Sequence, residues 1–153
     1  MAPRKTLGEV FAELPKKVKN ADKIEWLRQH HSPAMFYLLT LAFRDDVPKF
    51  LLPEGAPPFK PWKGRKYSEP SELQNELKRL YIYLEGQEPG LRQWKRELFF
   101  QRILEAISAE DVALLVAVKD KRLDKDFRCP RKVVEEAFPG LLTHPYFNPR
   151  FTK

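Results

Sequence analysis

Cysteine is almost absent from this sequence, since Cys129 is the only one among 153 residues. A single cysteine excludes an intramolecular disulfide and an all-cysteine zinc site, and it favours a reducing compartment. Long hydrophobic runs are missing too, because no stretch approaches the roughly 18 apolar residues of a membrane-spanning helix. The N-terminal residues Met1–Lys5 lack the apolar core of a signal peptide. We therefore expect a cytoplasmic protein.

The motifs of common catalytic centres are also absent. There is no glycine-rich phosphate loop, no nucleophile elbow and no His/Cys cluster with metal-ligand spacing. His30 and His31 close a predicted helix without a third ligand, and His144 lies far along the chain. Cys129 has basic neighbours that favour a thiolate, but no nearby histidine, so a structural role is the preferred interpretation. We predict no catalytic residues, no metal, no cofactor and no enzymatic activity.

The residues that are abundant describe one folded domain with a basic surface. Apolar residues make up 42% of the chain, with eleven Phe, five Tyr and three Trp, which is enough for a core. Lysine and arginine number 28 against 21 acidic residues, which gives a formal charge of +7. A surplus of this size favours nucleic acid or another anionic surface as a partner.

Helical signals run through most of the chain and predict an all-α fold, a compact bundle of six or seven helices with a long Pro-rich basic loop. Thr6, Asn20, Ser32 and Ser108 are predicted N-caps, because their side-chain oxygens can accept hydrogen bonds from first-turn amides. The helix at 33–44 is apolar on all sides and is predicted to be buried at the centre. Trp94 is predicted to share an apolar stripe with the other large side chains of its helix. After a short N-terminal helix, the predicted helices span 21–31, 33–44, 71–86, 91–107, 108–119 and 129–138.

The domain boundaries follow from proline and glycine. We predict a single helical domain at 1–142, whose N-terminal helix and connector occupy 1–20, and a C-terminal tail at 143–153. The Pro-rich loop is placed at 51–70, where five prolines and two glycines exclude a regular helix or a central strand. A loop of this length is usually functional or disordered.

Two basic clusters are candidate DNA-binding sites. The first, in the Pro-rich loop, combines cations with aromatic rings that can stack on bases, or that alternatively pin the loop onto the core. The second leads into the last helix, whose free amides suit a phosphate oxygen, although three aspartates weaken its field. A third basic group, within 78–102, is interpreted mainly as solvated helix surface. The candidate DNA-binding residues are Lys60, Lys63, Arg65, Lys66, Lys119, Lys121, Arg122, Arg128, Arg131 and Lys132.

Several stretches resemble the N-terminal helical DNA-binding domain of tailed-phage ATP-dependent DNA ligases. They are Ala21–His30, the apolar helix after it, Phe50–Pro53, and then Ile103–Asp120. The most specific stretch is Lys132–Leu142, in which a helix and an aromatic residue precede Pro-Gly-Leu. The whole chain also resembles a family of small tailed-phage proteins without an assigned function, especially at 52–58 and 117–121.

The ligase resemblance covers residues 21–142 and implies an all-α fold that holds duplex DNA through its backbone and minor groove. By position, the loop around Arg128 and the start of the last helix would contact phosphate. The ligase adenylation domain is not matched, because the chain ends soon after Leu142 and 119–121 lacks the Lys-x-Asp-Gly nucleophile pattern. We therefore expect a non-catalytic phage accessory protein in the host cytoplasm, which binds DNA without strong sequence preference at replication or repair intermediates. A phage or host replication protein is a further expected partner.

The alternative is a protein–protein adaptor or a structural phage protein. Its docking segments would be the Pro-rich loop and the aromatic tail, since extended segments with aromatic anchors often bind partners. The candidate partner-binding residues are Trp62, Tyr146, Phe147 and Phe151. Neither hypothesis includes a membrane partner.

Overall fold

A computed structural model of the protein describes residues 5–62, 72–145 and 147–151. Within these ranges the chain is all-helical, as predicted, and the one pairing of extended residues is an isolated bridge between Phe50 and Leu84. None of the helices in these ranges has the length and apolar character needed to cross a bilayer. In chain order the elements are α1 (Leu7–Ala12), η1 (Leu14–Lys16), α2 (Asn20–Gln29), α3 (Pro33–Phe43), η2 (Leu73–Asn75), η3 (Leu77–Tyr83), α4 (Gln93–Ala106), α5 (Ala109–Lys119), α6 (Leu123–Asp126) and α7 (Arg131–Ala137), where η denotes a 3-10 helix.

Three of the four predicted N-caps are confirmed, whereas Asn20 is the first residue of α2, whose N-cap Lys19 forms no side-chain capping bond. The Thr6 hydroxyl accepts a hydrogen bond from the Glu9 amide (3.2 Å), while the Glu9 carboxylate accepts one from the Thr6 amide (3.1 Å). Ser32 caps α3 with Pro33 in its first turn, and Ser108 caps α5. Each cap satisfies an amide that has no partner within its own helix, so these starts are readable from the sequence.

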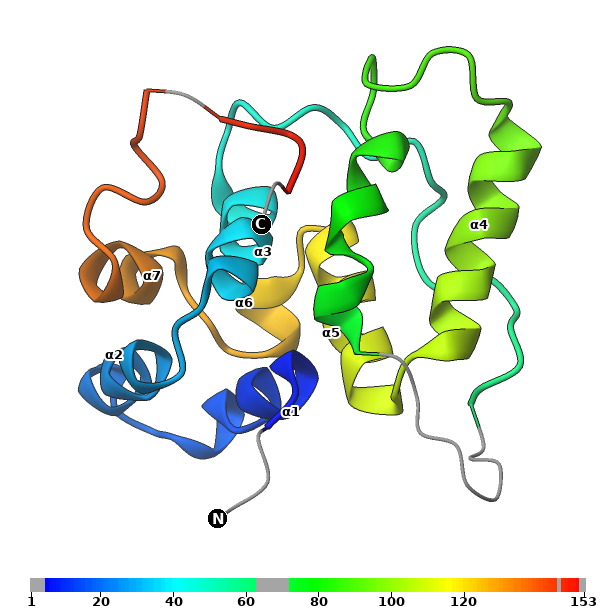
Figure 1. Cartoon of the computed structure of the whole chain (residues 1–153). Helices are drawn as coiled ribbons and strands as arrows, with labels where there is room; N and C mark the ends of the chain where they lie inside the picture. Colours follow the sequence, from blue (N-terminus) through cyan, green and yellow to red (C-terminus); the bar gives the residue numbers. More distant parts are fainter. Residues whose placement is uncertain (1–4, 63–71, 146, 152–153) are drawn as a thin grey trace.

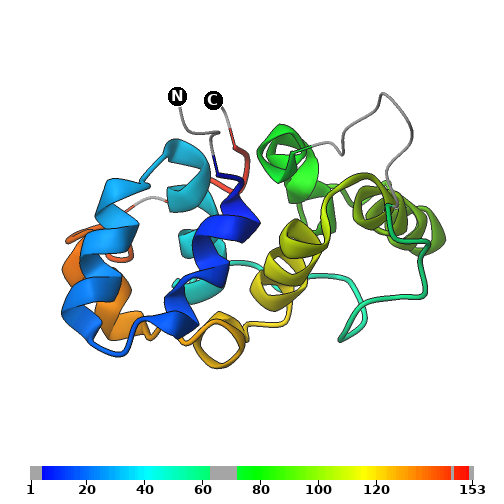
Figure 2. The same ribbon diagram turned by 90° about the horizontal axis from the view of Figure 1, so that it is seen from below.

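The helix α3 lies inside the molecule, as its apolar sequence predicts. Most of its residues are buried, and it packs against α5, while α1 also packs on α5 and α2 packs on α7. Figures 1 and 2 show α2 and α7 on one side of the molecule and η3 and α4 on the other, with α1, α3 and α5 between them. The core is therefore shared by both sides.

The contact between α1 and α5 depends on a glycine and a buried carboxylate. A Cβ atom on Gly8 would lie 2.3 Å from the backbone carbon of Glu110, so only glycine allows this approach. The Asp111 carboxylate accepts hydrogen bonds from the amides of Gly8 (2.7 Å) and Leu73 (3.2 Å). Burial raises the pKa of Asp111. This one side chain joins α1, η2 and α5.

The helix predicted at 71–86 is not an α-helix in its described part. It forms the two 3-10 segments η2 and η3. Leu77, Leu80 and Tyr83 are buried and lie three residues apart, which suits a helix with three residues per turn. The spacing of apolar residues indicated a helix correctly but did not distinguish its type.

The predicted burial of Trp94 is wrong, because its side chain is 60% exposed. Arg96 occupies the inward position instead and is only 5% exposed. Its guanidinium donates hydrogen bonds to the carbonyl oxygens of Ile82 (2.9 Å), Glu88 (3.2 Å) and Leu91 (3.2 Å). These bonds compensate the buried charge and hold the 84–92 connection against α4.

Candidate nucleic-acid interface

The segment 120–132 connects α5 to α7 and is anchored by buried side chains. Leu123, Phe127 and Cys129 all point into the core, and the ring of Phe127 meets that of Phe11 edge-on with centroids 6.4 Å apart. The residues Leu123–Asp126 form α6, so the stretch between the predicted helices 108–119 and 129–138 contains a helical turn. The exposed side chains of this segment therefore project from a well-packed backbone.

Arg128 and Lys132 are the predicted phosphate ligands that this segment leaves exposed and unpaired. Neither side chain forms a hydrogen bond or an ion pair with any residue that the structure describes. The backbone of Arg128 has a left-handed conformation (φ 50°), and its carbonyl oxygen accepts a hydrogen bond from Lys23 Nζ (2.7 Å). The contact from Lys23 holds the backbone while the guanidinium stays in solvent.

Two other predicted phosphate ligands, Lys119 and Lys121, turn inward. Lys119 is 5% exposed, pairs with the Asp120 carboxylate and donates a hydrogen bond to the carbonyl oxygen of Pro53 (2.7 Å). The ammonium of Lys121 donates to the carbonyl oxygen of Leu41, and burial lowers its pKa even though much of the residue's surface is exposed. The predicted surface position is wrong for Lys119, which is buried, whereas Lys121 lies at the surface with its ammonium bonded to the chain.

Arg122 and Arg131 are partly exposed but paired. Arg122 Nε lies 3.3 Å from an oxygen of Asp126, one turn further along the chain. Arg131 Nη1 donates to the carbonyl oxygen of Phe43 (2.7 Å) and lies 3.3 Å from a carboxylate oxygen of Asp45. These ion pairs also make the electrostatic potential of the segment more favourable for a phosphate, because they neutralise acids that would otherwise repel it.

The described part of the Pro-rich loop, 51–62, is fastened to the domain. The backbone amide of Lys60 donates to Glu105 on α4 (2.9 Å), and the amide of Gly55 donates to the Asp120 carboxylate (3.0 Å). Phe59 packs against the core, Trp62 is half-buried, and the side chain of Lys60 is exposed. This agrees with the interpretation in which aromatic residues pin the loop. The remaining predicted residues of this cluster, Lys63, Arg65 and Lys66, lie outside the described residues.

The aromatic residues of the tail pack on the chain's own domain. The Tyr37 hydroxyl donates a hydrogen bond to the carbonyl oxygen of Pro149 (2.6 Å), and the rings of Tyr37 and Phe151 have centroids 5.3 Å apart. The guanidinium of Arg44 lies 5.8 Å from the centroid of Phe147. Phe147 and Phe151 are thus half-buried inside the molecule rather than free anchors for a partner. Tyr146 lies outside the described residues.

The histidine pair and the cysteine have structural surroundings. The rings of His30 and Trp26 are tilted by 49° with centroids 4.1 Å apart, and His31 Nδ1 lies 2.7 Å from the carbonyl oxygen of Arg28. Burial raises the pKa of the Cys129 thiol to about 12, which keeps it protonated. The described ranges contain no group of three His, Cys, Asp or Glu side chains that could hold a metal ion.

Sequence reasoning missed a group of cations around Trp26. Lys17 Nζ lies 4.5 Å from the centroid of the Trp26 ring system. Burial, followed by the charges of Lys5 and Lys17, lowers the pKa of the neighbouring His30. The basic run Lys16–Lys19 was visible in the sequence, but it was interpreted only as a connector.

The chain matches a protein family of unknown function (DUF6433) over residues 10–125. Since this range covers more than half of the 153 residues, the chain belongs to that family. Comparison with curated proteins and with solved structures finds no match. The family has no described activity, so the relation to ligase DNA-binding domains stays a prediction.

Proposed function

We propose that this protein binds DNA through phosphate contacts, without strong sequence preference, and carries out no chemistry on it. The observation that supports this function is the division of charges in 120–132. Two of its three aspartates, Asp120 and Asp126, are paired with neighbouring cations, whereas Arg128 and Lys132 have no such partner among the described residues. Cations of this kind can replace the counterions of a DNA backbone.

The backbone at Arg128 adds to this argument. A left-handed φ is uncommon for a residue with a side chain and costs roughly 1 kcal/mol, so such positions often coincide with functional sites. Arginine holds this position at φ 50°, where glycine would fit without strain. An arginine at this position is explained if its side chain has a function that glycine could not provide. Contact with a phosphate group is such a function.

The ligase resemblance suggests where such binding would be used. It supports a phage-encoded accessory protein that acts at replication or repair intermediates, together with a phage or host replication protein. The alternative function as an adaptor is less well supported, because the tail aromatics Phe147 and Phe151 are engaged within the chain.

The test is fluorescence anisotropy of labelled intact duplex, nicked duplex and single-stranded DNA, titrated with protein between about 50 and 200 mM salt. We expect micromolar or tighter duplex binding at low salt, which weakens steeply as salt rises because counterions compete for the phosphates. The double variant Arg128→Glu, Lys132→Glu should lose this binding.

The matched control is Arg92→Glu, Lys95→Glu, which makes the same change in net charge on the exposed surface at the start of α4. It should retain most of the binding, because a local site is lost only when its own cations are reversed. Equal losses in both double variants would reject the site at Arg128. Absence of duplex binding by the wild-type protein at 50 mM salt would reject the function.

A further inference from the structure

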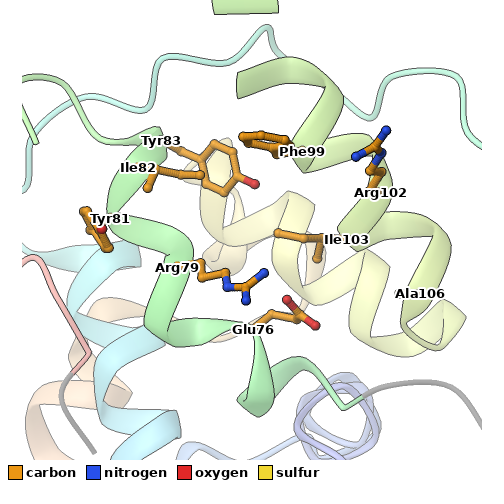
Figure 3. Close-up of a pocket in the computed structure, with 9 residues that line it drawn as sticks. All are labelled: Glu76, Arg79, Tyr81, Ile82, Tyr83, Phe99, Arg102, Ile103 and Ala106. Carbon is orange, nitrogen blue, oxygen red and sulfur yellow. The ribbon is translucent and has the colours of Figure 1, made fainter. Parts of the chain in front are cut away.

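A cavity of about 530 Å³ lies between η3 and the second half of α4 (Figure 3). Figures 1 and 2 both place these two elements on the side of the molecule away from α7, so the cavity is separate from the Arg128 surface. Its volume is within the range of pockets that hold small molecules. The proposed DNA-binding function does not use it.

One end of the cavity is apolar and aromatic. The side chains of Tyr83 and Phe99 lie next to each other there, and Ile103 from α4 continues the apolar surface (Figure 3). The ring of Tyr83 is held in place by an edge-on contact with Phe100, with centroids 5.5 Å apart. Phe99 is half-buried, so it is the ring of this pair that a ligand can reach. A planar heteroaromatic group is the natural occupant, because an exposed aromatic face favours flat rings by stacking.

The hydroxyl group of Tyr83 also indicates a ligand. The residue is 1% exposed, and its hydroxyl extends from η3 toward α4 (Figure 3). It forms no hydrogen bond with a described residue, although it is not sealed away from solvent. A hydroxyl group at a cavity wall, with no partner among the described residues, can bond to whatever fills the space beside it.

The walls of the cavity carry cations on both sides. Arg79 comes from η3 and Arg102 from α4, and both residues are exposed and form no ion pair with a described residue. Glu76 adds a carboxylate, and the charges of Glu76 and Arg79 both act on the Tyr83 hydroxyl, whose pKa is raised mainly by burial. Two guanidinium groups near an aromatic surface suit an aromatic ligand that also carries an anion.

We propose that this cavity binds a nucleotide. The base packs on the ring of Phe99, beside the Tyr83 hydroxyl, and the phosphate group lies between Arg79 and Arg102. Hydrogen-bond donors of the base or sugar face the Glu76 carboxylate and the Tyr83 hydroxyl. The nucleotide is either a free nucleoside monophosphate or the terminal nucleotide of a DNA strand, since both present the same ring and phosphate.

The experiment follows amide and aromatic NMR resonances of the full chain during titration with dAMP and dGMP. Adenosine, inorganic phosphate, and a short single strand with and without a 5′-phosphate are titrated in parallel. We expect dAMP or dGMP to shift resonances around the cavity, with adenosine and phosphate each binding about tenfold more weakly. Tighter binding of the 5′-phosphorylated strand than of the mononucleotides assigns the cavity to strand ends, and the reverse assigns it to free nucleotides.

Three variants identify the groups involved. Arg79→Ala and Arg102→Ala should each weaken nucleotide binding about tenfold, because each removes a charged hydrogen-bond donor. Tyr83→Phe keeps the ring and its packing and should weaken binding by about fivefold. Arg92→Ala is the control. It removes an exposed cation next to α4 that does not line the cavity, and it should leave nucleotide binding unchanged. An unchanged amide spectrum in the absence of ligand shows that each variant is folded.

The proposal is overturned if neither nucleotide shifts the cavity resonances at millimolar concentration. It is equally overturned if adenosine binds as well as dAMP, or if Arg79→Ala and Arg102→Ala both bind normally. Reversal of Arg128 and Lys132 should leave nucleotide binding unchanged, so the result does not depend on duplex binding.

Discussion

The α1–α5 contact and the segment 120–132 both use charged side chains, but in opposite ways. At the contact, Asp111 is 1% exposed, and both of its carboxylate oxygens accept hydrogen bonds from backbone amides. In the segment, Arg128 and Lys132 stay in solvent without partners among the described residues. The first arrangement holds helices together, and the second keeps charge available for a ligand. Substitutions should therefore change stability at the first and binding at the second.

The largest effect is expected at Gly8. The variant Gly8→Ala places a carbon 2.3 Å from the Glu110 backbone, which cannot yield as a flexible side chain would. We expect a loss of about 3 kcal/mol in the free energy of unfolding, because α1 must move away from α5. Urea denaturation followed by circular dichroism measures it. The control is Gly90→Ala, where the added carbon meets no atom within 4 Å. If the two variants are equally stable, α1 and α5 are not in the close contact described.

The next effect is expected at Asp111. The variant Asp111→Ala leaves the buried amides of Gly8 and Leu73 without their acceptor, which should cost about 2 kcal/mol at neutral pH. The same denaturation experiment measures it, with Glu110→Ala at the exposed neighbouring position as control. A loss below about 0.5 kcal/mol would mean that water replaces the carboxylate at both amides.

The pH dependence of Asp111 follows from its raised pKa. The native carboxyl group holds its proton more tightly than the unfolded chain does, so protonation favours the folded state. Its contribution is fully present below the ordinary pKa of 3.8 and is lost as pH rises through the native pKa. The difference in unfolding free energy between wild type and Asp111→Ala should thus be larger at pH 3 than at pH 7. A difference that grows with pH would contradict burial as the dominant cause.

A smaller and different effect is expected from single neutral substitutions in the segment. Arg128→Ala and Lys132→Ala should each leave the free energy of unfolding within about 0.5 kcal/mol of wild type. Each should lower the slope of log affinity for duplex DNA against log salt by about one, since one phosphate contact is lost. Lys119→Ala gives the contrast, because loss of its buried ion pair should lower stability. If Arg128→Ala lowers the free energy of unfolding as much as Lys119→Ala does, the distinction between the two regions is lost.

Low chemical reactivity is expected at Cys129, which lies in the same segment but faces the core. Because the thiol is buried and its pKa is raised to about 12, it should react with a disulfide reagent about 100-fold more slowly in the native protein than in urea. Absorbance of the released thiolate follows the reaction. Rapid native labelling would show that the segment opens often, so that its exposed cations are not held in place.

The sequence was most informative where a local hydrogen bond decides the structure. Thr6, Ser32 and Ser108 were identified as caps because a hydroxyl and a free amide lie within one turn. The apolar sequence of 33–44 likewise predicted the buried α3. The type of helix at 77–83 could not be predicted, since apolar residues three or four apart fit both an α-helix and a 3-10 helix. The exposure of Trp94 was unpredictable because it depends on carbonyl groups near Arg96, which lie outside α4.

For the candidate site, the sequence identified the basic segment but could not sort its cations. Lys119 and Lys132 are the same residue type in similar surroundings along the chain, yet one is 5% exposed and the other is on the surface. The difference arises from Pro53, whose carbonyl oxygen lies beside Lys119 although it is 66 residues away. The cavity between η3 and α4 was missed for the same reason, since its walls come from two segments that only the fold brings together.

The close approach of α1 to α5 also determines the order in which the chain can fold during synthesis. Gly8 leaves the ribosome 103 residues before its partner Asp111. At about 5–20 residues per second, this interval lasts about 5–20 s. A helix of six residues is not stable alone, so Phe11 and Leu14, both fully buried in the finished protein, have no native cover during that time. The N-terminal segment is thus open to chaperones and proteases throughout this interval, and its docking on α5 can only follow the synthesis of α5.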